Sequence, residues 1–325
     1  MRKNWIAASM LIAAILLSVI IIAFYRYGLH MGEDEKDYIN TIRISAILPH
    51  KDDGYWSLVE EGYLKAEEDN KDKVDIQIYV PQLNYHVDQM VELIERQVAA
   101  KVDAIIVQGI DNNNYSNALK KAIDAGIQVV LVDTDIREFP EHLYIGTNNR
   151  EAGIRMGEEL VKITGGQAKV AVMSGDENYW NLEQRYEGLL EVTDQYSGIE
   201  IVRLDYDYYD ALTVVKIYNE ILEENPEVDT LVCIEGTAGQ TFGVVFTEPL
   251  EDYRHILTFD SSIFTEAGIR NGILDGTMVQ GNYQMGYRSV QEVIHYEETG
   301  SYTQNNIFTP IYWYSKEDLE DENEE

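Results

Sequence analysis

From residue 41 onward, short runs rich in β-branched residues alternate with amphipathic segments of helical length. In the segment 87–98, apolar residues recur at spacings of three and four, as on one face of a helix. Strands that alternate with helices form parallel sheets covered on both faces, so the pattern predicts an α/β fold. The predicted strands are residues 42–48, 74–80, 104–109, 128–133, 169–175, 199–205, 230–236, 255–260 and 277–282.

Nine such strands can form one large sheet or two smaller ones, and two features favour two. The segment 137–149 interrupts the alternation after the fourth predicted strand. Beyond this segment the same alternation starts again with KVAVMSG at 169–175. We therefore expect two doubly wound parallel-sheet lobes.

The residues directly after the predicted strands form a candidate binding site, because ligands of open parallel sheets bind beyond the carboxyl ends of the strands. These positions are rich in acids, amides and aromatic residues: Asp53, Tyr55, Trp56, Gln108, Asp111, Asp133, Thr134, Asp176, Tyr179, Trp180, Tyr206, Asp207, Glu235, Thr237, Asp260, Gln280 and Asn282. Carboxylates and amides pair with hydroxyl groups, and flat rings cover apolar C–H faces. The set therefore suits a neutral polyhydroxylated ligand.

A simpler interpretation exists for single members of this set. Tyr55 and Trp56 can pack at the start of a helix, which is the favoured interpretation when the pair is taken alone. Asp133 and Asp260 can each be a helix N-cap, since carboxylate oxygens accept the free amides of a first helical turn. The repetition at several strand ends is what favours a binding site.

The sequence contains no recognisable catalytic, cofactor or metal motif. The glycine-bearing stretch 236–243 lacks the features of a phosphate-binding loop, and neither an HExxH helix nor a GxSxG elbow is present. Cys233, the single cysteine, lies in an apolar strand and is interpreted as a buried small hydrophobe. We therefore expect a binding protein without catalytic residues, metal or cofactor, rather than an enzyme.

Residues 5–25 contain no charged side chain, and a helix of this length, at ~1.5 Å per residue, spans a bilayer core. The apolar stretch is longer than that of a signal peptide and lacks a small-x-small cleavage site. Both features favour a retained membrane anchor, formed by residues 1–30, over a cleaved signal peptide. Arg2 and Lys3 precede the span and Arg26 follows it. The positive-inside rule then places the N-terminus inside a cell membrane and the single-pass protein's binding domain outside the cytoplasm.

The charge of the chain limits its partners. A formal net charge of -33, without a basic patch, argues against nucleic acid as a ligand. The acidic run at 317–325 is most simply a solvated, disordered tail.

Several motifs occur in a fixed order along the chain. They are ILPHKDDGYWSLVEEG, VDTD, YIGTNNREAG, AVMSGDEN with QRYEGL, TFD and GILDGTMVQGNYQMGYRSV. On these motifs, residues 41–314 resemble type I periplasmic binding proteins of the ribose/galactose class, the substrate-binding components of sugar ABC transporters. The resemblance implies two lobes joined by three crossings, with the ligand between them. It assigns 41–147 and 281–310 to the first lobe, and 148–280 and 311–316 to the second.

The resemblance also implies roles for individual residues. The family's ligand contacts fall on Asp53, Tyr55, Trp56, Asp133, Asn149, Tyr206, Asp260 and Gln280. Three family positions differ here: Thr134 replaces an arginine, Thr237 replaces an asparagine, and the second-lobe arginine falls on Glu183, with Arg185 two residues on. The acids therefore have few cations to pair with, and buried unpaired carboxylates are costly. Either waters and hydroxyls satisfy them, or the ligand carries a positive charge.

The resulting functional hypothesis is an extracytoplasmic solute-binding protein that captures a small polar ligand, a sugar first of all, for an ABC importer and its permease. The alternative is a sensory module that presents its ligand state to a histidine kinase or chemoreceptor, with an amine-bearing or other non-sugar ligand as a further option. The effector-binding half of a repressor is excluded, because a membrane span stands where a helix-turn-helix would be.

Overall fold

The computed structural model describes residues 41–321, apart from 51–53, 141, 178 and 250–254. The predicted anchor at residues 1–30, and Asp53 of the predicted site, lie outside these residues. Within the described part of the chain, no helix has the length and apolar character needed to cross a membrane.

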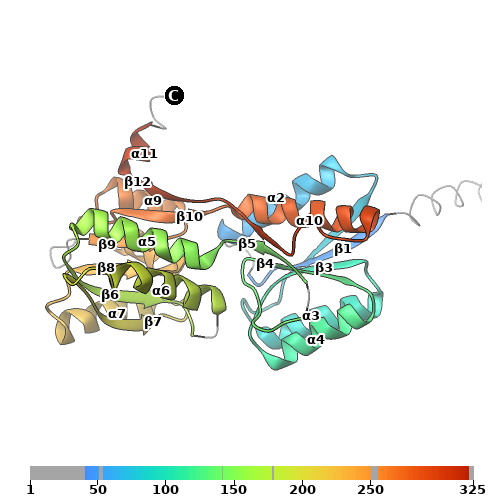
Figure 1. The fold of residues 1–325 in the computed structure, drawn as a ribbon, viewed down its shortest axis with the longest axis horizontal. Helices are drawn as coiled ribbons and strands as arrows, with labels where there is room; N and C mark the ends of the chain where they lie inside the picture. The colour runs from blue at the N-terminus through green and yellow to red at the C-terminus, as the bar shows by residue number, and fades with distance from the viewer. Residues whose placement is uncertain (1–40, 51–53, 141, 178, 250–254, 322–325) are drawn as a thin grey trace, which may run out of the picture.

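Two lobes lie side by side, each built on a six-stranded sheet (Figure 1). The sheet of the first lobe has the order β11-β5-β4-β3-β1-β2, and that of the second lobe β12-β10-β9-β8-β6-β7. The strands are β1 (Ile42–Ile47), β2 (Val74–Tyr79), β3 (Ala104–Gln108), β4 (Gln128–Val132), β5 (Leu143–Gly146), β6 (Ala168–Ser174), β7 (Ile199–Tyr206), β8 (Thr230–Cys233), β9 (His255–Phe259), β10 (Gly276–Gln280), β11 (Asn306–Phe308) and β12 (Ile311–Ser315).

The two sheets repeat one topology, and the prediction of two parallel-sheet lobes is confirmed. In each lobe the first strand pairs with both the second and the third, β1 with β2 and β3, and β6 with β7 and β8. The order therefore reverses at β1/β3 and at β6/β8, where ligand crevices of open sheets form. The described pairings are parallel except that of β12, which runs antiparallel to β10 at the edge of the second sheet. The short strands β5, β11 and β12 join the nine predicted from residue patterning.

Helices cover both faces of each sheet, as the buried character of the strands requires. In the first lobe, α2 and α10 pack on one face, and α3 and α4 on the other. In the second, α5 and α6 lie opposite α7, α8 and α9. The helices are α2 (Gly54–Asp69), α3 (Val87–Ala100), α4 (Asn113–Asp124), α5 (Asn149–Thr164), α6 (Trp180–Thr193), α7 (Ala211–Glu224), α8 (Gly236–Val245), α9 (Ile263–Arg270), α10 (Asn282–Thr299) and α11 (Lys316–Asp321).

Glycines let one helix pair in each lobe approach closely. A Cβ on Gly286 of α10 would lie 2.0 Å from the Val59 carbonyl oxygen of α2, and one on Gly153 of α5 would lie 2.0 Å from the Arg185 carbonyl oxygen of α6. Any side chain at these positions would push the helices apart. The contacts therefore fix α2 and α6, which both bring side chains to the cleft.

The chain passes between the lobes at three places. These connections join β5 to α5, β10 to α10, and β11 to β12. At the C-terminal end, the tail predicted to be disordered from residue 317 instead forms α11 as far as Asp321. Leu319 causes the difference, since its side chain is buried in the apolar core of the second lobe.

Candidate functional site

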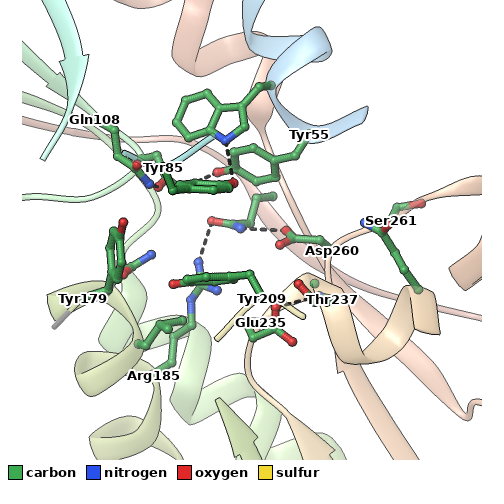
Figure 2. A pocket seen from close by; sticks show the side chains of 17 residues that line it. Tyr55, Tyr85, Gln108, Tyr179, Arg185, Tyr209, Glu235, Thr237, Asp260 and Ser261 are labelled. Atoms are coloured by element: carbon green, nitrogen blue, oxygen red, sulfur yellow. Dashed lines mark hydrogen bonds between the residues drawn. The ribbon is translucent and has the colours of Figure 1, made fainter. Parts of the chain in front are cut away.

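A cavity lies between the lobes, where the carboxyl ends of both sheets face one another (Figure 2). Its lining comes from the turns after β1, β2, β3 and β4 on one side, and after β6, β7, β8, β9 and β10 on the other. The lining residues are Tyr55, Trp56, Tyr85, Gln108, Asp133, Tyr179, Asn181, Leu182, Arg185, Tyr209, Glu235, Gly236, Thr237, Gln240, Asp260, Ser261 and Gln280.

The aromatic wall of the first lobe consists of two layers. Trp56 reaches the cavity, yet it is only 2% exposed and belongs to the apolar core beneath α2. Its Nε1 donates a hydrogen bond to the Tyr85 hydroxyl at 3.2 Å. Tyr55 meets the Trp56 ring edge-on, with centroids 5.2 Å apart. Trp56 is thus largely a support for Tyr85, a residue that the sequence analysis did not include.

Asp133 ends β4 with a φ of 64°, a left-handed conformation that aspartate tolerates better than most residues. Both carboxylate oxygens are already occupied. The Tyr55 hydroxyl donates to Oδ1, while Gln108 Nε2 (2.7 Å) and Thr134 Oγ1 (2.8 Å) donate to Oδ2. Thr134 therefore gives Asp133 a neutral partner at the position where the resemblance implied an arginine.

Asp260 ends β9 with the same φ of 64°. Gln280 Nε2 donates to its Oδ1 at 2.7 Å. Burial raises the pKa of Asp260 to about 7, although the Arg185 guanidinium and the Gln280 hydrogen bond act to lower it, and the nearby Asp133 and Glu235 carboxylates raise it further. Asp260 thus changes its charge near neutral pH.

Arg185 of α6 is 2% exposed and is the basic residue of the cavity lining. It donates to Asn149 Oδ1 at 2.9 Å, to the Ile234 carbonyl at 3.0 Å and to Gln280 Oε1 at 3.0 Å. The guanidinium carbon also lies 3.8 Å from the centroid of the Phe259 ring. Asn149 does not line the cavity, so its place is behind Arg185, which it orients.

The resemblance aligned the family's second-lobe arginine with Glu183, two residues before Arg185. The structure places Arg185 in the cavity lining, whereas Glu183 does not line this cavity. The Glu183 side chain is exposed and pairs with Arg137 of the first lobe at 2.8 Å. Gln280 Oε1 accepts from Thr147 Oγ1 at 2.6 Å as well as from Arg185. Arg185 is therefore tied to residues beside two of the three crossings.

The second lobe presents Tyr209 and Tyr179 rather than the predicted Tyr206. The Tyr209 ring stacks on Tyr85 across the cleft, with centroids 5.5 Å apart and planes at 14°, and Tyr179 meets it at 90°. Tyr206 still belongs to β7 and lines a separate cavity with Asp176. Tyr209 lies beyond the strand with a φ of 58°, which turns its ring over the cleft.

A carboxyl pair lies close to the floor of the cavity. Burial and the adjacent Glu235 carboxylate raise the pKa of Asp207 well above its usual value, so Asp207 holds a proton at neutral pH. Glu235 also caps α8 by accepting from the amides of Thr237 and Ala238 at 2.6 and 2.8 Å. The pair is thus held by the helix that presents Thr237 to the cavity.

Nine predicted site residues therefore meet on the cavity wall together with the buried Trp56: Tyr55, Gln108, Asp133, Tyr179, Arg185, Glu235, Thr237, Asp260 and Gln280. No group of histidines, cysteines and acids suited to a metal ion occurs among the described residues. The wall combines hydrogen-bonding groups with aromatic faces from two bodies, which suits the enclosure of a small polar molecule.

Comparison with known proteins agrees with this architecture. The D-ribose/D-allose-binding protein of Pseudomonas aeruginosa is 23% identical over 248 residues, 74% of this chain and 75% of that protein. GanP, a glucose-galactose binding protein from Geobacillus stearothermophilus, has a crystal structure that matches with a TM-score of 0.80 and 26% identity, over 86% of this chain and 99% of that one.

A third match is an ABC transporter solute-binding protein from Burkholderia graminis, crystallised with D-arabinose. It gives a TM-score of 0.78 at 25% identity, and covers 86% of this chain and 96% of that one. The family model described as a periplasmic binding protein domain matches residues 44–299. Since this match covers most of the chain and both lobes, the chain belongs to the periplasmic binding protein domain family.

Proposed function

We propose that the protein captures a small polyhydroxylated ligand, of the sugar class, between its two lobes and delivers it to an ABC importer. The observation that carries this proposal is the cavity at the meeting of two sets of strand ends, with hydrogen-bonding and aromatic side chains from both lobes. The relatives described above are named for ribose and allose, for glucose and galactose, or were crystallised with arabinose. Their likeness supports the ligand class.

Capture requires contacts that exist only when both lobes touch the ligand. Tyr85 and Tyr209 come from opposite lobes, and at 5.5 Å their ring centroids are too close for a sugar ring to lie between them. The lobes therefore have to separate before a sugar ring can enter between Tyr85 and Tyr209. When the lobes close on the ligand, each of the two rings contacts one face of it. The role is binding and release without chemical change of the ligand.

The place of action follows from the N-terminal sequence. Residues 5–25 are proposed as a single-pass anchor with the N-terminus inside, which leaves the two lobes outside the cytoplasm. An anchor also favours the alternative in which the protein presents its ligand state to a histidine kinase or chemoreceptor. Cross-linking of the full-length protein in its own membrane separates the two: an importer role predicts capture of a permease and its ATPase, and a sensory role predicts a receptor.

A thermal-shift screen tests the proposed function. The full-length protein in detergent is heated with pentoses, hexoses, polyols, amino sugars, nucleosides and polyamines. A ligand at 100 times its Kd adds about 2.7 kcal/mol to the free energy of unfolding, which raises Tm by several degrees. We expect such a rise with at least one sugar-class compound. Failure of every compound to raise Tm would contradict the proposal.

A further inference from the structure

The charges around the cavity do not balance. Three lining residues are acids, Asp133, Glu235 and Asp260, and one is a base, Arg185. Asp207, beside Glu235, holds a proton at neutral pH and adds no charge to this set. A neutral ligand would leave this surplus as it is.

Arg185 does not compensate the acids by direct pairing. Its hydrogen bonds within the described structure go to an amide oxygen of Asn149, a backbone carbonyl and the amide oxygen of Gln280. Its charge reaches Asp260 only through space, where it lowers the pKa of that carboxyl without overcoming the effect of burial. The guanidinium is thus used to hold the crossings.

Three acceptor atoms of the residues that line the cavity have no donor within the described part of the chain. Gln108 Oε1 and Asn181 Oδ1 are buried and have no hydrogen-bond partner among the described residues. Asp260 uses Oδ1 for Gln280, and no described residue donates to its Oδ2. A hydroxyl group offers one donor and two acceptor sites, whereas an ammonium offers three donors and no acceptor. Either group can donate to Asp260 Oδ2, but only the ammonium brings a positive charge to that carboxyl group.

Building on the proposed function, we propose that the ligand is an amino sugar or aminopolyol, with its protonated amine bound at Asp260. The faces of Tyr85 and Tyr209 border the same cavity and attract a cation as well as covering apolar C–H groups. Thr237 lies on the same side as Asp260 and offers a hydroxyl group to the rest of the molecule (Figure 2).

Binding of a cation at Asp260 is linked to a proton. The groups that face this carboxyl are Arg185 of α6, Asp133 after β4, Glu235 after β8 and the Tyr55 hydroxyl of α2. Without ligand, Asp260 has a pKa of about 7 and is partly protonated at neutral pH. A bound ammonium favours the charged carboxylate and so expels that proton. The affinity for the amine therefore rises as the pH rises through 7, until the amine itself loses its proton.

The experiment compares matched ligands by titration calorimetry on the full-length protein in detergent. D-glucose, D-glucosamine and N-acetyl-D-glucosamine form one set, D-galactose and its two derivatives a second, and an inositol with its amino derivative a third. In at least one set we expect the free amine to bind about tenfold tighter or more than its neutral partners, as a charge-assisted hydrogen bond allows. Repeating the titration in buffers with different ionisation heats should reveal proton release.

Variants locate the effect. Asp260→Asn keeps a residue that tolerates a positive φ, and we expect it to abolish both the amine preference and the proton release. Glu248→Gln removes an exposed acid outside the cavity and should change neither. Equal or tighter binding of the neutral compounds by the unaltered protein would overturn the amine inference and leave the proposed function standing. If no compound of either kind bound, both would fall.

Discussion

Asp133 and Asp260 hold equivalent places in the two lobes and differ in their partners. Asp133 directly follows β4 and Asp260 directly follows β9, which is the fourth strand of each lobe in chain order, and each residue has a φ of 64°. Asp133 accepts hydrogen bonds from three neutral donors of the first lobe, which occupy both of its oxygens. Asp260 accepts one, from Gln280, and keeps its other oxygen toward the cavity.

The same backbone position thus serves two purposes. In the first lobe the carboxylate is already satisfied and organises the wall, since Tyr55, Gln108 and Thr134 all point at it. In the second lobe no described residue donates a hydrogen bond to Asp260 Oδ2, and the raised pKa of this carboxyl group reflects the cost of burying an unpaired charge. Pairs of equivalent residues in repeated lobes can therefore be told apart by which hydrogen bonds are already made.

The largest expected difference between Asp133 and Asp260 is in how the stability of the protein depends on pH. The pKa of Asp260 is about 7 in the native state and lies near the ordinary aspartate value, about 3.9, in the unfolded state, so between pH 5 and 7 the native state holds a proton that the unfolded state has released. This contribution to stability is lost as the pH rises through 7. Between pH 5 and 8 we expect Asp260 to account for a loss of about 3 kcal/mol, measured as the difference between urea unfolding of the unaltered protein and of Asp260→Asn. An identical pH dependence of the two proteins would contradict this.

Removal of Arg185 should act on Asp260 and spare Asp133. Arg185→Met removes the hydrogen bonds to Asn149 Oδ1 and the Ile234 carbonyl and leaves Gln280 Oε1 with Thr147 alone, which we expect to lower the free energy of unfolding by about 3 kcal/mol. Loss of the nearby positive charge should also raise the pKa of Asp260, which carboxyl NMR can follow. The control is Arg150→Met, whose exposed pairs with Glu187 and Glu191 should contribute less than about 1 kcal/mol. Similar losses in both variants would argue against the buried role of Arg185.

The substitution Asp133→Asn should destabilise the folded protein. The new amide NH₂ group would stand where one carboxylate oxygen now accepts hydrogen bonds, for example from Gln108 and Thr134. We expect the free energy of unfolding to fall by about 2 kcal/mol at pH 8. At the same pH, Asp260→Asn removes an unpaired charge and should leave stability unchanged or increased. Urea unfolding of the two variants side by side checks the opposite signs. Equal destabilisation by both would remove the distinction between the two acids.

The aromatic stack across the cleft gives the smallest expected effect, and it acts on binding. Tyr209→Ala removes the second-lobe face that opposes Tyr85, and we expect about tenfold weaker binding of whichever ligand the thermal screen identifies. Tyr208→Ala is the matched control, because Tyr208 has a similar φ of 53° but is 57% exposed. Calorimetric titration should give an unchanged Kd for the control. Equal losses in the two variants would place the ligand elsewhere.

The sequence predicted the sheets well because long, buried, β-branched runs leave little alternative. Its residue patterning missed β5 and β11, which have four and three residues and lie beside or at a sheet edge, where neighbouring strands rather than patterning decide, whereas the resemblance implied the last strand, β12. The acidic tail was expected to be disordered from its charge alone, but one apolar residue, Leu319, packs α11 onto the second lobe.

The candidate site was predicted in part for similar reasons. Asp133, Asp260 and Gln280 follow buried strands whose ends are easy to place, and all three line the cavity. Tyr85 was missed because the turn after the second strand was not considered, although the same strand-end rule applies there. Tyr209 was missed because only Tyr206 and Asp207 were taken as the residues after this strand, whereas β7 ends at Tyr206 and the third residue beyond it reaches the cavity.

The most direct test is a crystal structure of the protein with the tightest ligand from the screen. The account predicts one ligand between the lobes, with a polar atom within hydrogen-bond distance of Asp260 Oδ2. It also predicts that Asp133 keeps its bonds from Tyr55, Gln108 and Thr134. A ligand bound outside the cavity, or one that displaces the partners of Asp133 and leaves Asp260 untouched, would contradict it.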